Sequence, residues 1–180
     1  MGETVSLHRH EARQTLSEHQ LRHMSNIQLV QYVLERFHVV HRTQLETAIE
    51  LAQRVESVHA GEPLCPNGLH DHLLVLQAEL LHHMFKEEQI LFPMLMNGQR
   101  PTGPILAMES EHEEHAASIN HLIDLTGGFD LPSDACGSWR ELYRILKEFV
   151  ADLELHIKIE NDILFISEAV RHGTCCGGCQ

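Results

Sequence analysis

Two histidine–glutamate pairs with identical spacing are the most chemically informative feature of the sequence. His83 precedes Glu87, and His156 precedes Glu160, each by four residues. Four residues are about one helical turn, so on a helix each pair directs an imidazole and a carboxylate at the same volume. The surrounding segments, HMFKEEQILF and HIKIENDILF, resemble each other and lie 73 residues apart. The pattern indicates an internal repeat that carries the same chemistry in both halves.

Two histidine pairs complete this repeat. His38-x-x-His41 recurs as His112-x-x-His115, displaced by 74 residues. Histidine is the commonest metal ligand in proteins. We expect His38 and His112 to face the same centre as the histidine–glutamate pairs. His41 and His115 lie one turn further along, where they are either hydrogen-bond partners behind the ligands or additional ligands; we favour the first role.

Together these residues predict a buried site for two metal ions. A single histidine on an apolar helix face is more often a hydrogen-bonded core residue than a ligand, and one HxxxE pair alone is a weak motif. A metal-free core, however, would have to bury six polar or charged groups with no basic residue on the same faces, and burying an unpaired carboxylate is costly. Cations at the centre remove that cost. The predicted ligands are His38, His83, Glu87, His112, His156 and Glu160.

The donor atoms narrow the choice of metal. Imidazole nitrogen and carboxylate oxygen, without thiolate, suit iron, manganese or zinc. Glutamates that reach in from opposite repeats can bridge two ions, as in di-iron helical bundles. Six protein ligands are too few for two six-coordinate ions, so oxo, hydroxo or water bridges would fill some positions and a small molecule could take others. Such a site is compatible with both catalysis and metal transport.

Four helices must position these side chains. Three stretches rich in Gly, Pro and Asn supply turns between them, at residues 60–68, 97–104 and 126–132. Between the turns, apolar residues recur every three or four positions, and the predicted ligands share their faces. The predicted helical segments are residues 26–59, 69–96, 105–125 and 133–171. Short connections between four such helices predict an all-α fold, an up-down-up-down four-helix bundle.

The apolar faces also give finer expectations. We expect Ile27 on the buried face of the first segment, where the spacing contains one step out of register, and Ile90 and Met94 on that of the second. Pro93 should kink the second helix or end its regular part. Ser133 is expected to cap the start of the fourth helix.

The predicted domain organisation has three parts: an N-terminal arm or short extra helix at residues 1–25, the bundle at 26–171, and a cysteine-rich tail at 172–180. The odd number of cysteines, three of them in the tail, does not resemble a disulfide framework. We expect the two cysteines in or beside loops to be structural bystanders. The tail is either an unstructured segment, which we favour, or a redox or metal-transfer element. The cysteines are Cys65, Cys136, Cys175, Cys176 and Cys179.

Composition limits the partners. The chain has 180 residues, 16 histidines and a formal net charge of −13, so nucleic acid and anionic membrane surfaces are poor partners. No apolar run is long enough to span a bilayer, and the first residues lack the apolar region of a secretory signal. We therefore expect a cytosolic protein; its oligomeric state is left open.

With these residues in view, the sequence resembles the hemerythrin-like domain of the repair-of-iron-centres family of bacterial di-iron proteins. The resemblance extends over residues 29–169, most of the chain, and six separate motifs make it specific. The motifs are Arg36-Phe-His38-x-x-His41-Arg42, His83-x-x-Lys86-Glu87-Glu88-Gln89-Ile-Leu-Phe-Pro93, Gly103-Pro104-Ile105, Met108-Glu-Ser-Glu-His112, Ala135-Cys136 with Trp139, and His156-x-x-x-Glu160-Asn161-x-x-Leu164-Phe165.

The resemblance implies a hemerythrin-like bundle with two iron ions, joined by an oxo or hydroxo bridge. The four histidines of the predicted set would be terminal ligands, and Glu87 and Glu160 would bridge the ions. The sequence departs from the family at two points. The family commonly has an N-terminal cysteine-containing domain, whereas residues 1–25 contain no cysteine, and it usually has no histidine at the position of His115. Oxygen-carrying hemerythrins space their last carboxylate five residues after its histidine, so the four-residue spacing here argues against simple oxygen carriage.

The family is associated with nitrosative and oxidative stress. Our leading hypothesis is accordingly a cytosolic non-haem di-iron protein that binds nitric oxide and supports the repair of damaged iron–sulfur proteins. Whether it is also an enzyme, a di-iron nitric oxide reductase, is left open by the sequence. One alternative is a non-catalytic iron donor or a sensor of nitric oxide or oxygen. A further alternative is a ferritin-like oxidase or peroxidase.

Overall fold

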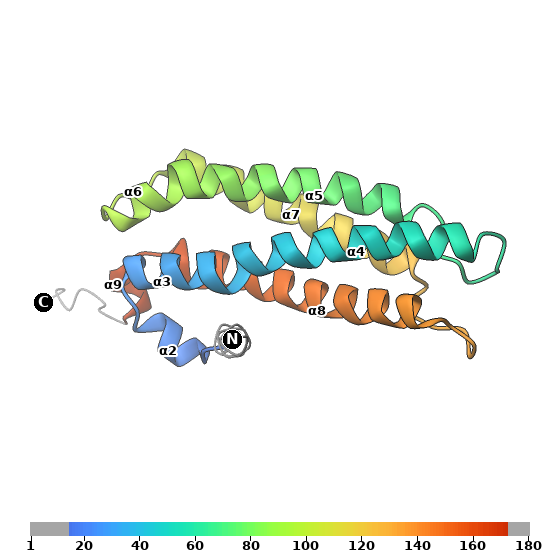
Figure 1. Cartoon of the computed structure of the whole chain (residues 1–180). Coiled ribbons are helices and arrows are strands. Elements are labelled where there is room, and N and C mark those ends of the chain that lie inside the picture. Colours follow the sequence, from blue (N-terminus) through green and yellow to red (C-terminus); the bar gives the residue numbers. More distant parts are fainter. Residues whose placement is uncertain (1–14, 173–180) are drawn as a thin grey trace, which may run out of the picture.

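The computed structural model describes residues 15–172, and within that range the chain is helical without β-strands. Most of these helices join end to end into four long segments, which lie lengthwise beside one another (Figure 1). The first comprises α3, η1 and α4, the second α5, η2 and α6, the third α7, and the fourth α8 and η3. Their bounds are α3 Asn26–Val33, η1 Leu34–His38, α4 Val39–Val58, α5 Leu69–Lys86, η2 Glu87–Leu91, α6 Phe92–Met96, α7 Thr102–Leu125, α8 Gly137–Ile159 and η3 Glu160–Leu164.

Two short helices, α2 (Glu18–Arg22) and α9 (Glu168–Arg171), lie near the start of α3. Both α2 and α3 begin with a serine whose side chain accepts the backbone N–H three residues on, while the third residue returns a glutamine side chain to the serine backbone. The Arg171 side chain donates to the Asn26 side chain at 2.6 Å, which joins α9 to the start of α3. Residues 15–25 thus include the short extra helix; residues 1–14 and the tail from 173, with its three cysteines, lie outside the described residues.

The helices pack around two separate apolar cores. One contains Leu45, Leu80, Trp139 and Phe149, and the other Phe37, Phe92, Phe165 and their neighbours. In each of the four segments the predicted ligands fall in the sequence between residues of one core and residues of the other. The polar side chains therefore form a belt that is closed off from water by apolar packing on both sides.

Three π-helical turns interrupt the long segments, at η1, η2 and η3. A π-turn adds one residue to the helical circuit and moves every later side chain round the axis. Ile90 is consequently 51% exposed although it was predicted to be buried, and Leu91 and Leu95 occupy the interior in its place. Ile27, also predicted to be buried, is 47% exposed, because the interior before η1 is filled by Leu29 and Val30.

The ends of two helices also differ from the predictions. Ser133 does not cap the fourth helix, because the Ala135 N–H bonds to the carbonyl of Pro132 in a turn and α8 begins only at Gly137. The regular part of the second helix ends at Lys86, and Pro93 lies in the first turn of α6, where its missing N–H is tolerated. None of the helices within residues 15–172 is both long and apolar enough to cross a bilayer.

Candidate metal centre

The six predicted ligands converge in the belt between the two cores. His38 ends η1, His83 lies in the last turn of α5, and His112 and His156 project from α7 and α8. Glu87 and Glu160 are the first residues of η2 and η3. All six side chains are almost completely buried, and both carboxylates have no exposed surface.

These side chains form two groups of four that share both glutamates. One group is His38, Glu87, His156 and Glu160; the other is His83, Glu87, His112 and Glu160. Within each group, the potential ligand atoms all lie within 4.8 Å of one another. Each group therefore offers two imidazole nitrogens and two carboxylate oxygens to one cation.

The carboxylates divide their oxygen atoms between the two groups. Glu87 places Oε2 3.4 Å from His38 Nε2 and Oε1 3.5 Å from His83 Nε2. Glu160 places Oε1 3.2 Å from His156 Nε2 and Oε2 3.1 Å from His112 Nε2. Atoms about 3 Å apart are the usual neighbours around an ion that each of them approaches to about 2.1 Å. One oxygen for each cation is the arrangement that a bridging carboxylate requires.

A cation would also satisfy atoms that the protein leaves without a partner. Among the described residues, neither oxygen of Glu87 or Glu160 has a hydrogen-bond partner, although both carboxylates are fully buried. The Nε2 atoms of His83 and His112 lie 3.2 Å apart and point at the same place. Buried polar groups are normally hydrogen-bonded, and their exceptions cluster at functional sites. These side chains are therefore suited to bind two cations.

Comparison with known proteins places the chain in a family of cation-binding domains. Residues 29–165 match the hemerythrin HHE cation binding domain. The chain belongs to this family. The matched residues include all six side chains of the belt.

Curated relatives of this HHE domain carry a more specific name. The chain is 42% identical over 139 residues to the iron-sulfur cluster repair protein YtfE of Yersinia pseudotuberculosis serotype O:1b (strain IP 31758). The protein of the same name from Yersinia pestis (strain Pestoides F) matches equally well. These matches cover 76% of this chain, and the chain spans 63% of the length of either relative.

Three histidines of the HHE domain are fixed by oxygen atoms behind them. The Nδ1–H groups of His38, His83 and His112 donate to Glu88 Oε1 at 2.8 Å, Glu111 Oε2 at 2.9 Å and Asn161 Oδ1 at 2.8 Å. A partner at Nδ1 sets the tautomer, so that Nε2 carries the lone pair and faces the centre. Two of these partners are themselves held by basic side chains: Arg42 donates to Glu88, and Lys86 donates to Glu111.

None of these three partners is among the residues predicted from the sequence. The repeat contains a signal for two of them. Glu88 follows Glu87, and Asn161 follows Glu160, and each bonds a histidine on a neighbouring helix. The residue after each shared glutamate thus orients a ligand in both halves of the domain.

The fourth histidine has different surroundings. Within the described part of the chain, His156 Nδ1 has no hydrogen-bond partner. Its ring instead stacks on Phe37, with 5.0 Å between the ring centroids and 7° between the planes. Phe37 precedes His38 as Glu111 precedes His112, so the two halves present an aromatic ring and a carboxylate at equivalent positions. The two cation positions are therefore chemically unequal.

The charges of the belt act on the pKa values of its members. Burial tends to lower the pKa of His38 and His112, but nearby carboxylates outweigh burial and raise both values. Burial and the neighbouring His38 hold the pKa of His156 well below its usual range. Burial would raise the pKa of Glu160, but His112, His83 and His38 together lower it. Glu160 thus stays ionised and ready to bind a cation.

His41 and His115 lie beside the two groups and belong to neither. His41 packs 5.3 Å from the His156 ring, and its Nδ1 lies 3.3 Å from Gln44 Oε1. His115 packs edge-on against His83 at 4.9 Å. Burial lowers the pKa of His41 to about 3 and that of His115 to about 4, so both rings are neutral near pH 7.

Proposed function

We propose that this chain is a non-haem di-iron protein that takes part in iron–sulfur cluster repair. The proposal assigns His38, His83, His112 and His156 as terminal ligands and Glu87 and Glu160 as bridging ligands. Its strongest support is that two fully buried carboxylates each direct one oxygen at each of two histidine pairs. The names of the Yersinia relatives support the physiological role, with iron–sulfur proteins as targets.

The proposal includes an up-down-up-down bundle over residues 26–171 that keeps the ions away from bulk water. The packing of α4 against α5 and α8, and of α7 against α5 and α8, supports this arrangement. Glu88, Glu111 and Asn161 hold the Nδ1 protons and thereby keep three Nε2 atoms available. Burial of all six ligands favours a small diatomic reactant over a bulky one.

We further propose that the site binds nitric oxide and reduces it, in a cytosolic response to nitrosative stress. Iron, when bound, would supply open coordination positions and electrons for this reaction. The part of the protein is to hold two reactant positions side by side in a buried site, which the shared carboxylates achieve by tying both positions to the same two side chains.

An iron donor is the second candidate, and one observation favours it. Among the described residues, His156 has no hydrogen-bond partner at Nδ1 and contacts only aromatic rings behind it, so the position that it shares with His38 has less support than the other. An ion held there would be released first. Donation and nitric oxide chemistry would then use the two positions differently.

Metal content and Mössbauer spectra of protein purified without added metal test the ligand assignment. We expect two irons per chain in a coupled pair. Glu87→Ala and Glu160→Ala should each lower iron occupancy sharply, because each removes a ligand from both ions. Glu154→Ala, which removes an exposed carboxylate from α8, is the matched control and should keep both irons. If the protein with both belt substitutions retains two irons, the bridging assignment is wrong.

Anaerobic mixing of the diferrous protein with nitric oxide tests the activity. Nitrous oxide formed over repeated turnovers supports reduction, and a stable adduct without product supports a sensor. Iron transfer to an apo iron–sulfur acceptor supports donation. Rapid peroxide consumption with none of these results would favour an oxidase or peroxidase.

A further inference from the structure

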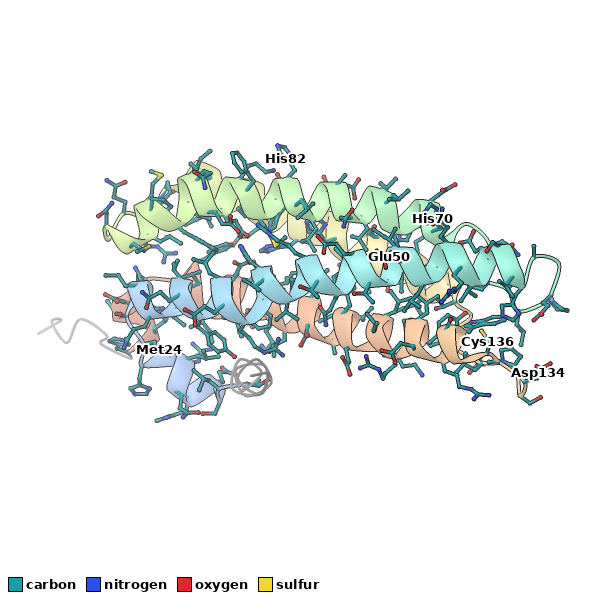
Figure 2. All side chains as sticks on the ribbon, in the orientation of Figure 1. Met24, Glu50, His70, His82, Asp134 and Cys136 are labelled. Carbon is teal, nitrogen blue, oxygen red and sulfur yellow. The ribbon has the colours of Figure 1, made fainter. Side chains whose placement is uncertain are left out.

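A second group of reactive side chains lies far along the bundle from the metal belt, where α4 ends and α8 begins. Figure 2 labels Cys136 at this end, next to the start of α8. Cys136 is the residue before α8, and His59 is the residue after α4, so the helix packing brings them together from positions 77 residues apart. Its place beside a loop predicts a structural bystander, whereas the contacts described below give Cys136 a chemical environment of its own.

Three side chains here are arranged as a nucleophile, a base and a group that orients the base. His59 Nε2 lies 3.2 Å from Cys136 Sγ. His59 Nδ1–H donates to Glu62 Oε1 at 2.8 Å, which leaves Nε2 free to accept the thiol proton. The Glu62 N–H bonds to the His59 carbonyl at 3.0 Å, so a tight turn keeps the carboxylate beside the ring. The same order of groups activates nucleophiles in hydrolases and in other thiol proteins.

The surrounding structure fixes the imidazole and favours a thiolate. The His59 ring packs on the fully buried Trp139, with 4.9 Å between ring centroids. Hydrogen bonds from the backbone N–H of Trp139, and then of Ser138, act with His59 to lower the pKa of Cys136, against the opposing effect of burial. These N–H groups belong to the first turn of the 23-residue helix α8, whose amino end favours negative charge.

Cys65, in the same region, is a natural reference. It is also a free thiol, but it is buried. Burial, together with the carboxylates of Glu56 and Glu62, raises its pKa. Cys136 is only half-buried, and the His59 imidazole lies against its sulfur. The two thiols therefore differ in their exposure to solvent and in the ionisable side chains around them.

We propose that Cys136, His59 and Glu62 form a thiol-modification site that exchanges with small disulfides. The Cys136 sulfur attacks one sulfur of the disulfide, an S–S bond forms between the protein and one half of the reagent, and the original S–S bond breaks. His59 takes the Cys136 proton and gives it to the departing thiolate, so that one thiol is consumed and one released with no net change in oxidation state. Nothing in this reaction involves the metal belt.

The pH dependence of alkylation in the full-length iron-loaded protein tests the site. Iodoacetamide labelling of each cysteine, followed by peptide mass spectrometry, should show Cys136 reacting about tenfold or more faster than Cys65 at pH 7. The midpoint of its rate against pH should lie below that of N-acetylcysteine. His59→Phe keeps a ring over Trp139 but removes the base, so the rate at pH 7 should fall severalfold and the midpoint should rise.

His70→Phe is the matched control, because His70 lies on the neighbouring helix α5 and its Nδ1 bonds to Asp71 at 3.2 Å, not to Cys136. It should leave the Cys136 rate unchanged, and both variants should keep the helical circular dichroism and iron content of the parent. Glu62→Gln should give a smaller decrease than His59→Phe. Oxidised glutathione should form a mixed disulfide at Cys136 and release one equivalent of glutathione. A Cys136 rate equal to that of Cys65, or unchanged by His59→Phe, would overturn the proposal.

Discussion

At the scale of single residues, the metal belt depends on atoms that do not touch the metal. Glu88, Glu111 and Asn161 each hold the Nδ1 proton of one histidine. The sequence predicts the ligands because their spacing along one helix is sufficient to align them. It does not predict Glu111 as a partner of His83, because these two residues lie on different helices and only packing brings them together. Helical periodicity describes one helix at a time.

Inequality between the two cation positions leads to a prediction about metal release. His83 has a carboxylate behind it, whereas His156 has Phe37. We expect a chelator to remove iron in two phases, with the ion at the His38–His156 position leaving first. Removing a hydrogen-bond partner of a ligand typically costs about 10- to 100-fold in metal affinity. Glu111→Gln should therefore accelerate the slow phase about tenfold or more and bring it towards the fast one.

The measurement is iron release to excess chelator, followed by absorbance. Glu113→Gln provides the control, since Glu113 lies on the same helix and is exposed. A single phase in the parent protein would show that the aromatic ring and the carboxylate support their histidines equally. An unchanged slow phase in the Glu111 variant would show that this carboxylate does not stabilise the site.

At the scale of helices, the informative elements are the three π-turns. His38 is the last residue of η1, and Glu87 and Glu160 are the first residues of η2 and η3. In contrast, α7 has no such turn, and its buried residues, including Ile105 and Leu122, recur every three or four positions along the whole helix. Regular periodicity therefore predicts α7 well and fails at Ile90, just beyond the start of η2. The step out of register in the first segment, between Leu34 and His38, coincides with η1.

Removing one residue from η2 tests whether the π-turn serves the metal. Ile90 lies in this turn and is mostly exposed, so its deletion should convert the turn to regular α-helix while Leu91 and Leu95 stay in the core. We expect the variant to keep its helical circular dichroism. We also expect it to lose at least half of its iron, because the backbone at Glu87 would no longer direct the carboxylate at both ions.

Ile90→Ala serves as the comparison for the deletion, because it removes the exposed side chain and keeps the residue count of the turn. It should retain parental iron content, measured by elemental analysis. Full iron occupancy in the deletion variant would mean that the π-turn has no part in metal binding.

At the scale of the whole molecule, a polar belt lies between two apolar cores. The cores supply the stability of the bundle, and the belt reduces it unless cations are present, because two carboxylates are buried without hydrogen-bond partners. The all-helical fold followed from the apolar periodicity, and so did the level at which the belt crosses all four segments. The start of α8 at Gly137 did not follow, because a local turn at Pro132 decides it.

This arrangement predicts opposite effects of the same substitution with and without metal. Replacing both Glu87 and Glu160 by glutamine removes two buried negative charges. At an alkaline pH, at which His38 and His112 have lost the protons that hold the Glu160 pKa down, the metal-free variant should unfold at a higher temperature than the metal-free parent, because no imidazolium then compensates the buried carboxylates. With iron added, the order should reverse, because only the parent gains stability from binding.

Thermal unfolding of both proteins, with chelator and with ferrous iron under anaerobic conditions, gives the four values needed. The control variant replaces two exposed glutamates, Glu113 and Glu154, by glutamine. Its unfolding temperatures with chelator and with iron should both be close to those of the parent. A metal-free variant less stable than the metal-free parent would show that the carboxylates are already well paired with protonated histidines.

The sharing of glutamates has a consequence for the two repeats. Residues 26–96 contribute His38, His83 and Glu87, and residues 102–171 contribute His112, His156 and Glu160. Each group of four takes one imidazole and one carboxylate from each repeat, and neither repeat contains a full group. Two bound ions would therefore cross-link the two halves of the polypeptide. Release of an ion to an acceptor would remove one of these cross-links, so we expect iron delivery and loosening of the contact between the repeats to occur together.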